Sequence, residues 1–283
     1  MFVTRFAPSP TGPLHLGHAY SAILAHDMAR AEGGTFLLRI EDIDRARCRT
    51  EWESAIYDDL SWLGLTWDRP VLRQSDRLPA YHDALQALWD RRLLYPCTCR
   101  RHDIKMALSA PQEGAQTLGP DGFVYPGTCR WRLRGGKIRL GDALRLDVAM
   151  TFEGLPPIGF DETGCAPGHH IVEAEAFRSG IGDFAIARRE FETSYHLSVV
   201  VDDAAQGITH VVRGLDLFEA THIHVLLQHL LGLQTPIYHH HRLIRDDQGK
   251  RLAKRDDARA LSKYRAEGAT PADIRRMIGL PNP

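Results

Sequence analysis

The apolar positions in the first third of the chain alternate between two periods. Residues 2–6 favour a short strand, and Leu16, Ala19, Ile23 and Met28 then recur at helical spacing until Gly33 and Gly34 end the pattern. A second strand signal and two helical patterns follow, at Thr35–Ile40, Thr50–Leu63 and Pro79–Leu94. Strand and helix signals in alternation predict a parallel α/β sheet of the Rossmann type, whose ligands lie beyond the carboxyl ends of the strands.

The pattern changes after residue 95. From Pro96 to about Glu173 glycine and proline are frequent and helical periodicity fades, so we expect an insertion with short strands at Arg130–Leu133 and Ala143–Val148. The α/β pattern then returns. Its parts are apolar runs at Leu197–Val201 and Ile208–Arg213, an apolar helix at Leu217–Leu231, a strand near Pro236–His240 and a helix with Thr270 as its N-cap and Pro271 at its first position. The expected units are therefore 1–95 and 174–240 for the two halves of the α/β domain, 96–173 for the insertion and 241–283 for a charged loop with a helical end.

The segment from Arg5 to His18 joins the first strand to the first helix and carries the strongest chemical signal. Prolines restrict this turn, and Gly12 and Gly17 allow a ligand to approach the backbone closely. His15 and His18 share one face of the helix start, where they can donate hydrogen bonds to phosphate beside the positive end of the helix. The glycine spacing fits neither a dinucleotide fingerprint nor a Walker loop. The segment predicts a nucleotide site.

Composition says more about the cellular compartment of the protein than about the reaction it catalyses. A chain of 283 residues that is 43% hydrophobic can bury a substantial core, and its formal charge of -1 leaves RNA binding to local basic patches, including the run from Arg130 to Arg139. The N-terminus has no charged-then-apolar leader, and no apolar run approaches the length of a membrane span. Five cysteines in a reducing compartment indicate free thiols or metal ligands. We expect a cytoplasmic protein, a monomer, without a membrane partner.

The first loop resembles the His-x-Gly-His signature of class I aminoacyl-tRNA synthetases. Two segments are similar to the glutamyl and glutaminyl branch of that class. They are the start of the loop, Arg-Phe-Ala-Pro-Ser-Pro-Thr-Gly, and a second block, Leu37-Leu-Arg-Ile-Glu-Asp-Ile-Asp44. The loop Lys250–Arg255 resembles the mobile Lys-Met-Ser-Lys-Ser loop, with Arg251 at its first lysine and Lys254 at its second. This chain departs from that motif twice, because arginine replaces the first lysine and Ala253 replaces the usual serine. The resemblance covers nearly the whole chain and implies a Rossmann-like catalytic domain.

The chemistry that the resemblance implies is attack by an amino-acid carboxylate on the α-phosphorus of ATP, used with Mg²⁺. The nucleotide site would consist of His15, Gly17, His18, Arg251 and Lys254, with His15, His18 and Lys254 as the catalytic donors. By the same resemblance, glutamate would be held by Arg5, Ala7, Ser9, Glu41, Tyr195 and Arg213. Guanidinium groups suit its carboxylates, and Glu41 suits its ammonium group. Which arginine takes which carboxylate stays open, and His196 stands where the family often has glutamine.

The cysteine spacing adds a metal hypothesis. Cys97, Cys99 and Cys129 supply three thiolates, which can bind Zn²⁺ tetrahedrally with one further ligand. The resemblance implies Tyr125 as that fourth ligand in a structural zinc site, with His102 as the alternative. Cys48 and Cys165 have no partner pattern, and we expect them to be inert.

The chain ends soon after Lys254, which leaves too few residues for the anticodon-binding domain of a full glutamyl-tRNA synthetase. We therefore expect a stand-alone catalytic module, and the resemblance implies the subfamily that attaches glutamate to queuosine in the anticodon of tRNA(Asp). The alternatives are a truncated glutamyl-tRNA synthetase that charges a tRNA 3′ end, and a non-catalytic paralogue that binds ATP or an acyl-adenylate.

Overall fold

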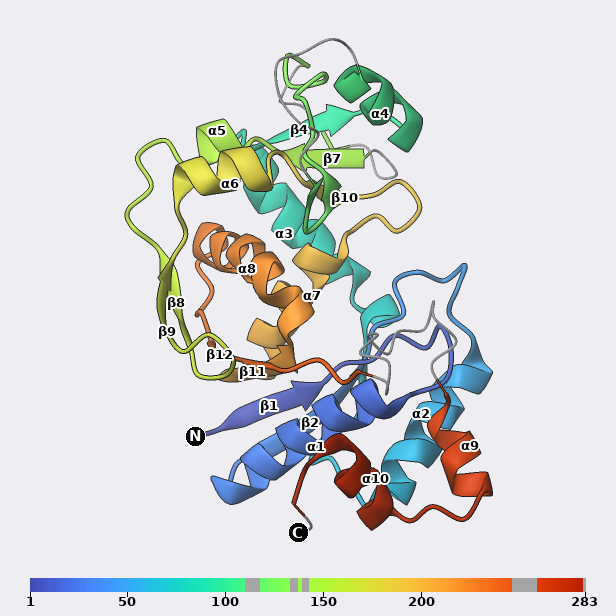
Figure 1. The fold of residues 1–283 in the computed structure, drawn as a ribbon. Helices are drawn as coiled ribbons and strands as arrows, with labels where there is room; N and C mark the ends of the chain where they lie inside the picture. The colour runs from blue at the N-terminus through green and yellow to red at the C-terminus, as the bar shows by residue number, and fades with distance from the viewer. Residues whose placement is uncertain (110–117, 133–136, 139–142, 246–258, 282–283) are drawn as a thin grey trace.

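Two mainly parallel sheets lie edge to edge at the centre of the fold in this computed structural model (Figure 1). The structure describes residues 1–109, 118–132, 137–138, 143–245 and 259–281. The first sheet has the order β1 (Val3–Phe6), β2 (Thr35–Ile40) and β3 (Leu72–Arg73). The second has the order β11 (His210–Gly214), β12 (Ile237–His241), β8 (Gly159–Glu162) and β9 (Gly168–Ile171), and β9 alone is antiparallel to its neighbour. The amide of Thr209 donates to the carbonyl of Val3 at 2.9 Å, so β1 lies beside β11.

Helices cover both faces of this sheet because its strands are apolar on both faces. On one side, Leu37 and Val211 pack with α3 (Leu78–Asp90), α7 (Tyr195–Gln206) and α8 (Phe218–Leu230). On the other, Phe36, Leu38 and Val212 pack with α1 (Leu16–Ala31), α2 (Thr50–Trp62) and α10 (Pro271–Ile278). Strand residues therefore alternate between two cores, as a doubly covered parallel sheet requires. The expected α/β class is confirmed.

A separate antiparallel sheet has the order β10 (Ala185–Ala187), β7 (Ala143–Leu146) and β4 (Leu94–Cys97). It draws on chain from both sides of the segment expected as an insertion, whose residues in β8 and β9 instead join the parallel sheet. Around the antiparallel sheet lie α4 (Arg101–Ser109), the hairpin β5 (Leu118–Gly119) with β6 (Gly122–Phe123), α5 (Val148–Thr151) and α6 (Ala174–Gly180). The predicted strand at Arg130–Leu133 is wrong over Arg130–Arg132, which forms hydrogen-bonded turns, with Arg130 N donating to Gly127 O and Arg132 N to Cys129 O; Leu133 lies outside the described residues. The strand predicted at Ala143–Val148 exists but ends at Leu146, where Asp147 caps α5.

The two segments near residue 200 differ in structure. Ile208–Arg213 overlaps β11, whereas Leu197–Val201 lies inside α7, which Ser194 caps at its start and Gly207 ends in a left-handed conformation. A short, mostly apolar run fits a buried helix as well as a strand, so length and caps decide between them. The C-terminal segment follows the prediction: after α9 (Leu261–Ala266), Thr270 caps α10 and Pro271 is its first residue. Short 3₁₀ turns occupy Gln74–Asp76 and Leu215–Leu217.

Within the described residues, no helix is both long and apolar enough to cross a membrane.

Candidate active site

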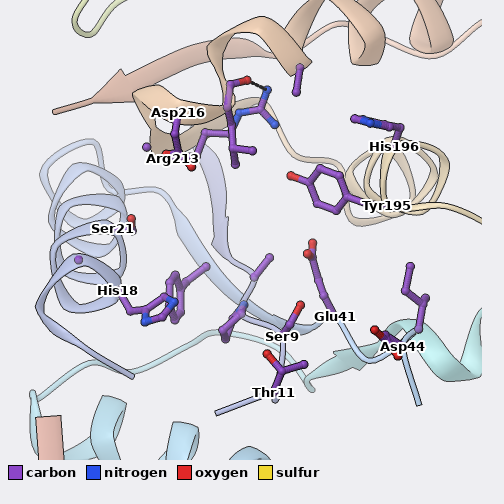
Figure 2. A pocket seen from close by; sticks show the side chains of 18 of the residues that line it. Ser9, Thr11, His18, Ser21, Glu41, Asp44, Tyr195, His196, Arg213 and Asp216 are labelled. Carbon is purple, nitrogen blue, oxygen red and sulfur yellow. Dashed lines mark hydrogen bonds between the residues drawn. The ribbon is translucent and has the colours of Figure 1, made fainter. Parts of the chain in front are cut away.

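A cleft of about 720 Å³ opens at the carboxyl ends of β1, β2 and β11. Figure 2 shows side chains from the first loop, the end of β2, the start of α7 and β11 pointing into it. The sequence-predicted residues that line it are Arg5, Ala7, Ser9, His15, Gly17, His18, Glu41, Tyr195 and Arg213. A single cleft therefore brings together the described members of both the predicted nucleotide site and the predicted glutamate site.

His15 and His18 cap the helix that begins in the first loop. Gly17 N donates to His15 Nδ1 at 3.1 Å, and His15 N donates to His18 Nδ1 at 3.2 Å, so each ring accepts a backbone hydrogen bond. A neutral imidazole whose Nδ1 accepts carries its proton on Nε2. Both rings therefore offer an Nε2–H donor beside the positive end of α1, which is the arrangement that binds phosphate.

Arg5 lies in a buried network of alternating charges. Its Nε and NH2 donate to the two carboxylate oxygens of Asp203, at 2.9 and 3.3 Å. Arg39 donates to the same Asp203 at 2.6 Å and to Glu41 at 3.2 Å. Burial alone would raise the pKa of Asp203, but the two guanidinium groups hold it below its usual value. Burial raises the pKa of Glu41, and Arg39 and Arg5 oppose that effect.

Arg213 lies on the opposite side of the cleft among uncharged groups. Its Nε donates to His240 Nε2 at 3.1 Å, its NH1 to His224 Nδ1 at 3.0 Å and its NH2 to Thr221 Oγ1 at 2.8 Å. Among the residues that the structure describes, no carboxylate forms an ion pair with Arg213, although the residue is only 6% exposed. A buried cation without an anionic partner is costly, and it favours a ligand that brings a negative charge.

Tyr195 is the first residue of α7, and its hydroxyl points into the cleft between Arg213 and Glu41 (Figure 2). Burial raises the pKa of this phenol, so it keeps its proton and can donate a hydrogen bond.

Arg251 and Lys254 lie outside the described residues. The chain beyond them returns at the first loop, since Ala260 bridges to His15 and Leu261 N donates to Leu14 O at 2.8 Å.

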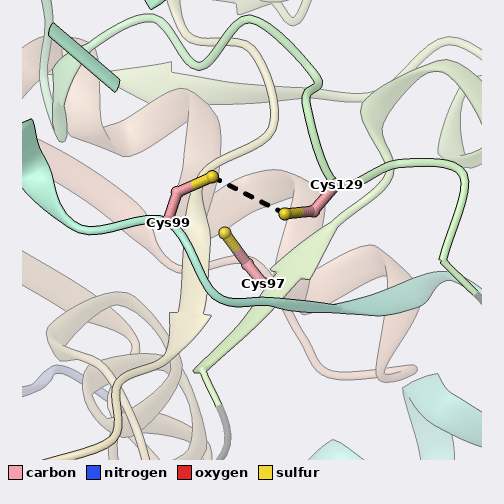
Figure 3. A group of neighbouring side chains, drawn as sticks. All are labelled: Cys97, Cys99 and Cys129. Carbon is pink, nitrogen blue, oxygen red and sulfur yellow. Dashed lines mark hydrogen bonds between the residues drawn. The ribbon is translucent and has the colours of Figure 1, made fainter. Parts of the chain in front are cut away.

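The three predicted metal-binding cysteines form a second cluster, at the end of β4 (Figure 3). Their sulfur atoms all lie within 4.8 Å of one another, and Cys99 Sγ lies 3.6 Å from Cys129 Sγ. The Tyr125 hydroxyl lies 3.6 Å from Cys97 Sγ and 3.3 Å from Cys99 Sγ. His102 is not part of this cluster. The sulfur atoms are too far apart for a disulfide, in which they lie about 2.05 Å apart.

The motifs did not reveal Asp203, His224 or His240, or the part that Arg39 plays. Asp203 pairs with Arg5 across 198 residues of sequence, and a contact of that separation has no local pattern. Arg39 lies inside the second motif block, where a charged residue within an otherwise apolar strand was the available signal. Five more charged residues line the cleft without having been predicted: Asp44, Arg47, Asp121, Arg188 and Asp216.

Comparison with known proteins gives a consistent result. Residues 1–117 and 171–281 match the family described as tRNA synthetases class I (E and Q), catalytic domain. The chain is 67% identical to a glutamyl-Q tRNA(Asp) synthetase of Rhodobacter capsulatus, over 98% of this chain and 100% of that protein. It is 40% identical to the protein of the same name from Geobacter sulfurreducens, over 93% of this chain and 78% of that one.

Solved structures agree on the fold. A glutamate-tRNA synthetase from Elizabethkingia anophelis superposes with a TM-score of 0.76 at 23% identity, over 98% of this chain and 61% of that one. The methionyl-tRNA synthetase of Mycobacterium tuberculosis bound by methionyl-adenylate gives a TM-score of 0.57 at 12% identity, over 98% of this chain and 63% of that one. The chain thus spans less than two thirds of either synthetase.

Proposed function

The chain belongs to the class I tRNA synthetases of the glutamate and glutamine branch, and from this premise we propose that it joins glutamate to queuosine in the anticodon of tRNA(Asp), using ATP. The observation that carries the proposal is the 67% identity to a glutamyl-Q tRNA(Asp) synthetase along the full length of that protein. We also propose that the protein is a cytoplasmic monomer that binds glutamate, ATP and a tRNA carrying queuosine.

In the first step, a glutamate carboxylate oxygen attacks the α-phosphorus of ATP, and pyrophosphate leaves. The protein need not supply a nucleophile, so its task is alignment and stabilisation of the charge that builds on phosphate oxygens. His15 and His18 supply Nε2–H donors at the helix start. Arg251 and Lys254, from the loop outside the described residues, complete the proposed set. Class I synthetases use ATP with Mg²⁺, which the triphosphate itself chiefly binds.

We assign the glutamate pocket to Arg5, Ala7, Ser9, Glu41, Tyr195 and Arg213. These residues line the same cleft. Arg5 and Arg213 provide two cations for the two carboxylates of glutamate, and the buried Glu41 provides an anion for its ammonium group. Arg213 has the stronger claim to a substrate carboxylate, because Asp203 already neutralises Arg5. A charge-assisted hydrogen bond to a buried guanidinium is the strongest contact such a substrate can make.

The cysteine cluster fits a structural zinc ion. With Zn–S of about 2.3 Å and Zn–O of about 2.0 Å, tetrahedral ligands lie about 3.8 Å (sulfur to sulfur) and about 3.5 Å (sulfur to oxygen) apart. The observed separations of 3.6 Å for the Cys99 and Cys129 sulfurs and of 3.3 and 3.6 Å to the Tyr125 oxygen are close to these values. The guanidinium of Arg145 lies 3.9 Å from the centre of the Tyr125 ring and donates to Cys97 Sγ at 3.4 Å, which offsets the negative charge of the ligands.

Metal analysis tests this assignment. The purified protein should contain one zinc ion per chain, and Cys129→Ser should lower that content and the melting temperature while Cys165→Ser changes neither. Cys165 is an exposed cysteine outside the cluster, so it is a matched control. Zinc-free protein that melts at the same temperature would retire the assignment.

The second step transfers the glutamyl group to the RNA. A hydroxyl of the queuosine cyclopentene diol attacks the adenylate carbonyl, an ester forms and AMP leaves. Two adjacent ring hydroxyls resemble the diol of a terminal ribose, so a synthetase site can accept them. Three of the basic side chains of the insertion, Arg130, Arg132 and Lys137, are proposed to contact RNA phosphates, which give affinity without sequence information. Arg130 would do so while its Nε remains paired with Asp183 at 2.8 Å.

The decisive experiment uses an isolated anticodon stem-loop of tRNA(Asp). The stem-loop with queuosine should accept labelled glutamate, and the same stem-loop with guanosine should not. Charging of unmodified tRNA(Glu) at its 3′ end, with the queuosine stem-loop inert, would establish the truncated synthetase instead. A protein that binds ATP and charges neither RNA would be the non-catalytic paralogue.

A further inference from the structure

The groups that surround Arg213 are uncharged, and two of them are histidines from different elements. We propose that His224 of α8 and His240 of β12 are positioning residues: uncharged acceptors that hold the Arg213 guanidinium in place and leave its positive charge for a carboxylate of the substrate. This inference rests on the proposed function, in which the cleft binds glutamate. It adds two residues that touch Arg213 and are absent from the cleft lining.

The guanidinium has almost no freedom to move. His240 Nε2 and His224 Nδ1 accept from Nε and NH1, at 3.1 and 3.0 Å, and Thr221 Oγ1 and Leu217 O accept from NH2 at 2.8 and 3.3 Å. Each of the three nitrogens therefore has a partner. The Tyr238 ring packs against the same group, 5.1 Å from it. Orientation is thus achieved entirely by neutral acceptors and an aromatic face.

A second layer of contacts determines which nitrogen of each histidine accepts. His240 Nδ1 lies 2.6 Å from Glu162 Oε2, so its proton is on Nδ1 and its Nε2 is the acceptor for Arg213. Glu162 cannot turn away, because it also accepts from Gly164 N at 2.6 Å and from His240 N at 3.0 Å. A guanidinium can only donate, so His224 Nδ1 accepts from Arg213, and the His224 proton lies on Nε2, 3.1 Å from His196 Nδ1, which accepts it.

The two histidines remain neutral in their buried positions. Burial lowers the pKa of His224 well below its usual value, and the charge of Arg213 lowers it further. Burial and Arg213 also lower the pKa of His240, although Glu162 opposes the shift. The charged groups around this cluster are Arg213 and Arg5 from the cleft, Asp216 beside Arg213 at the cleft wall, Glu162 from β8, and Asp121 and Arg188 beyond His196. Neither imidazole therefore contributes a charge that would repel or replace a substrate carboxylate.

The choice of histidine has a physical reason. A carboxylate at either position would pair with Arg213 in the empty cleft, and the substrate would have to compete with that pair. An apolar residue would leave a buried guanidinium N–H without an acceptor. A neutral imidazole avoids both costs. Asp203 shows the other arrangement in the same cleft, since it neutralises Arg5 directly.

A pair of isosteric substitutions separates charge from shape. His224→Asn keeps an uncharged oxygen near the Nδ1 position, and His224→Asp places a negative charge at the same point. We expect His224→Asn to change the KM for glutamate by no more than about threefold, whereas His224→Asp raises it by about tenfold or more. The KM for ATP should stay unchanged in both. His229→Asp adds the same charge to an exposed position of α8 and should behave as wild type.

These measurements use glutamate-dependent pyrophosphate exchange, with circular dichroism and melting curves to show that each variant is folded. Equal glutamate KM values for folded His224→Asn and His224→Asp would overturn the inference. If His224→Asp does not fold, His240→Gln and His240→Leu replace it, and the Gln variant must retain more glutamate affinity than the Leu variant. A wild-type protein that shows no exchange would instead contradict the proposed function.

Discussion

The two sides of the cleft hold an arginine in opposite ways. Arg5 faces the carboxylate of Asp203, which Arg39 shares, so the positive charges on that side have anionic partners within the protein. Arg213 faces two neutral histidines and a threonine hydroxyl. Both guanidinium groups are about equally buried, at 5% and 6% exposure. From equal burial with unequal charge balance we infer that the Arg5 side stabilises the fold, and we propose that the Arg213 side keeps a charge available to the substrate.

The largest expected effect comes from breaking the charge balance on the Arg5 side. Asp203→Ala leaves Arg5 and Arg39 buried beside each other without their shared carboxylate, and it should lower the free energy of unfolding by about 3–5 kcal/mol. Urea denaturation at neutral pH measures it. A variant that unfolds at the wild-type urea concentration would show that this network does not stabilise the fold.

The Arg213 side should respond in activity instead. Arg213→Met keeps the apolar stem and removes the charge, and Glu162 remains paired with His240. We expect kcat/KM for glutamate activation to fall by roughly 100-fold, about 3 kcal/mol, because a charge-assisted contact to the substrate is lost. The loss of stability should be smaller than for Asp203→Ala. Arg5→Ala should reduce both quantities, since Arg5 pairs with Asp203 and also lines the cleft. Near-normal activation by Arg213→Met would refute the division of roles.

The two sides should also lose stability in different pH ranges. Burial lowers the pKa of His196, behind Arg213, from 6.5 to about 4. Between these values the unfolded chain binds a proton that the folded chain does not, so stability is complete above pH 6.5 and falls as the pH drops towards 4, by at most about 1.4 kcal/mol per pH unit for this residue. The pKa of Asp203 is lowered, so its contribution is complete above its ordinary pKa of 3.8 and is lost only in more acidic solution.

Urea midpoints measured from pH 7 down to pH 4 test this separation. His196→Gln should make the decline shallower, because glutamine does not titrate, whereas His224 and His240 still do. A wild-type midpoint that stays constant from pH 6.5 to pH 4 would contradict the assignment of neutral buried histidines.

The smallest expected effect belongs to the residue between the two sides. Tyr195→Phe removes one neutral hydroxyl from the cleft and leaves the ring contacts with His196 and His224 intact. Glutamate activation should fall by about 1 kcal/mol in kcat/KM, with no change in the melting temperature. An effect as large as that of Arg213→Met would mean that the phenol, and not the arginine, dominates the glutamate contact.

Local sequence patterns predicted the parts of this molecule that short stretches of chain determine. The α/β fold class, the strand before Glu41 and the cap at Thr270 are all confirmed. Predictions failed where local patterns were ambiguous. Arg130–Leu133 has alternating polarity, but its described part, Arg130–Arg132, forms turns next to Cys129. The run Leu197–Val201 is helical because Ser194 and Gly207 supply caps.

The site shows the same division. Arg5 and Arg213 could be found from motifs, because each lies in a strand beside recognisable neighbours. Their different surroundings could not be found, because Asp203 lies 198 residues from Arg5 and His240 lies 27 residues from Arg213. The charge state of a buried side chain depends on such distant partners. Only the folded structure therefore shows which of the two arginines is neutralised by a carboxylate of the protein.

Pyrophosphate exchange without RNA tests the central claim most directly, namely that the cleft is a complete site for activating glutamate. Purified protein, ATP, Mg²⁺ and labelled pyrophosphate should give labelled ATP when glutamate is present, and not with glutamine or aspartate in its place. The result should be the same before and after treatment with ribonuclease. Exchange that requires added tRNA, or that proceeds equally well with glutamine, would contradict the account.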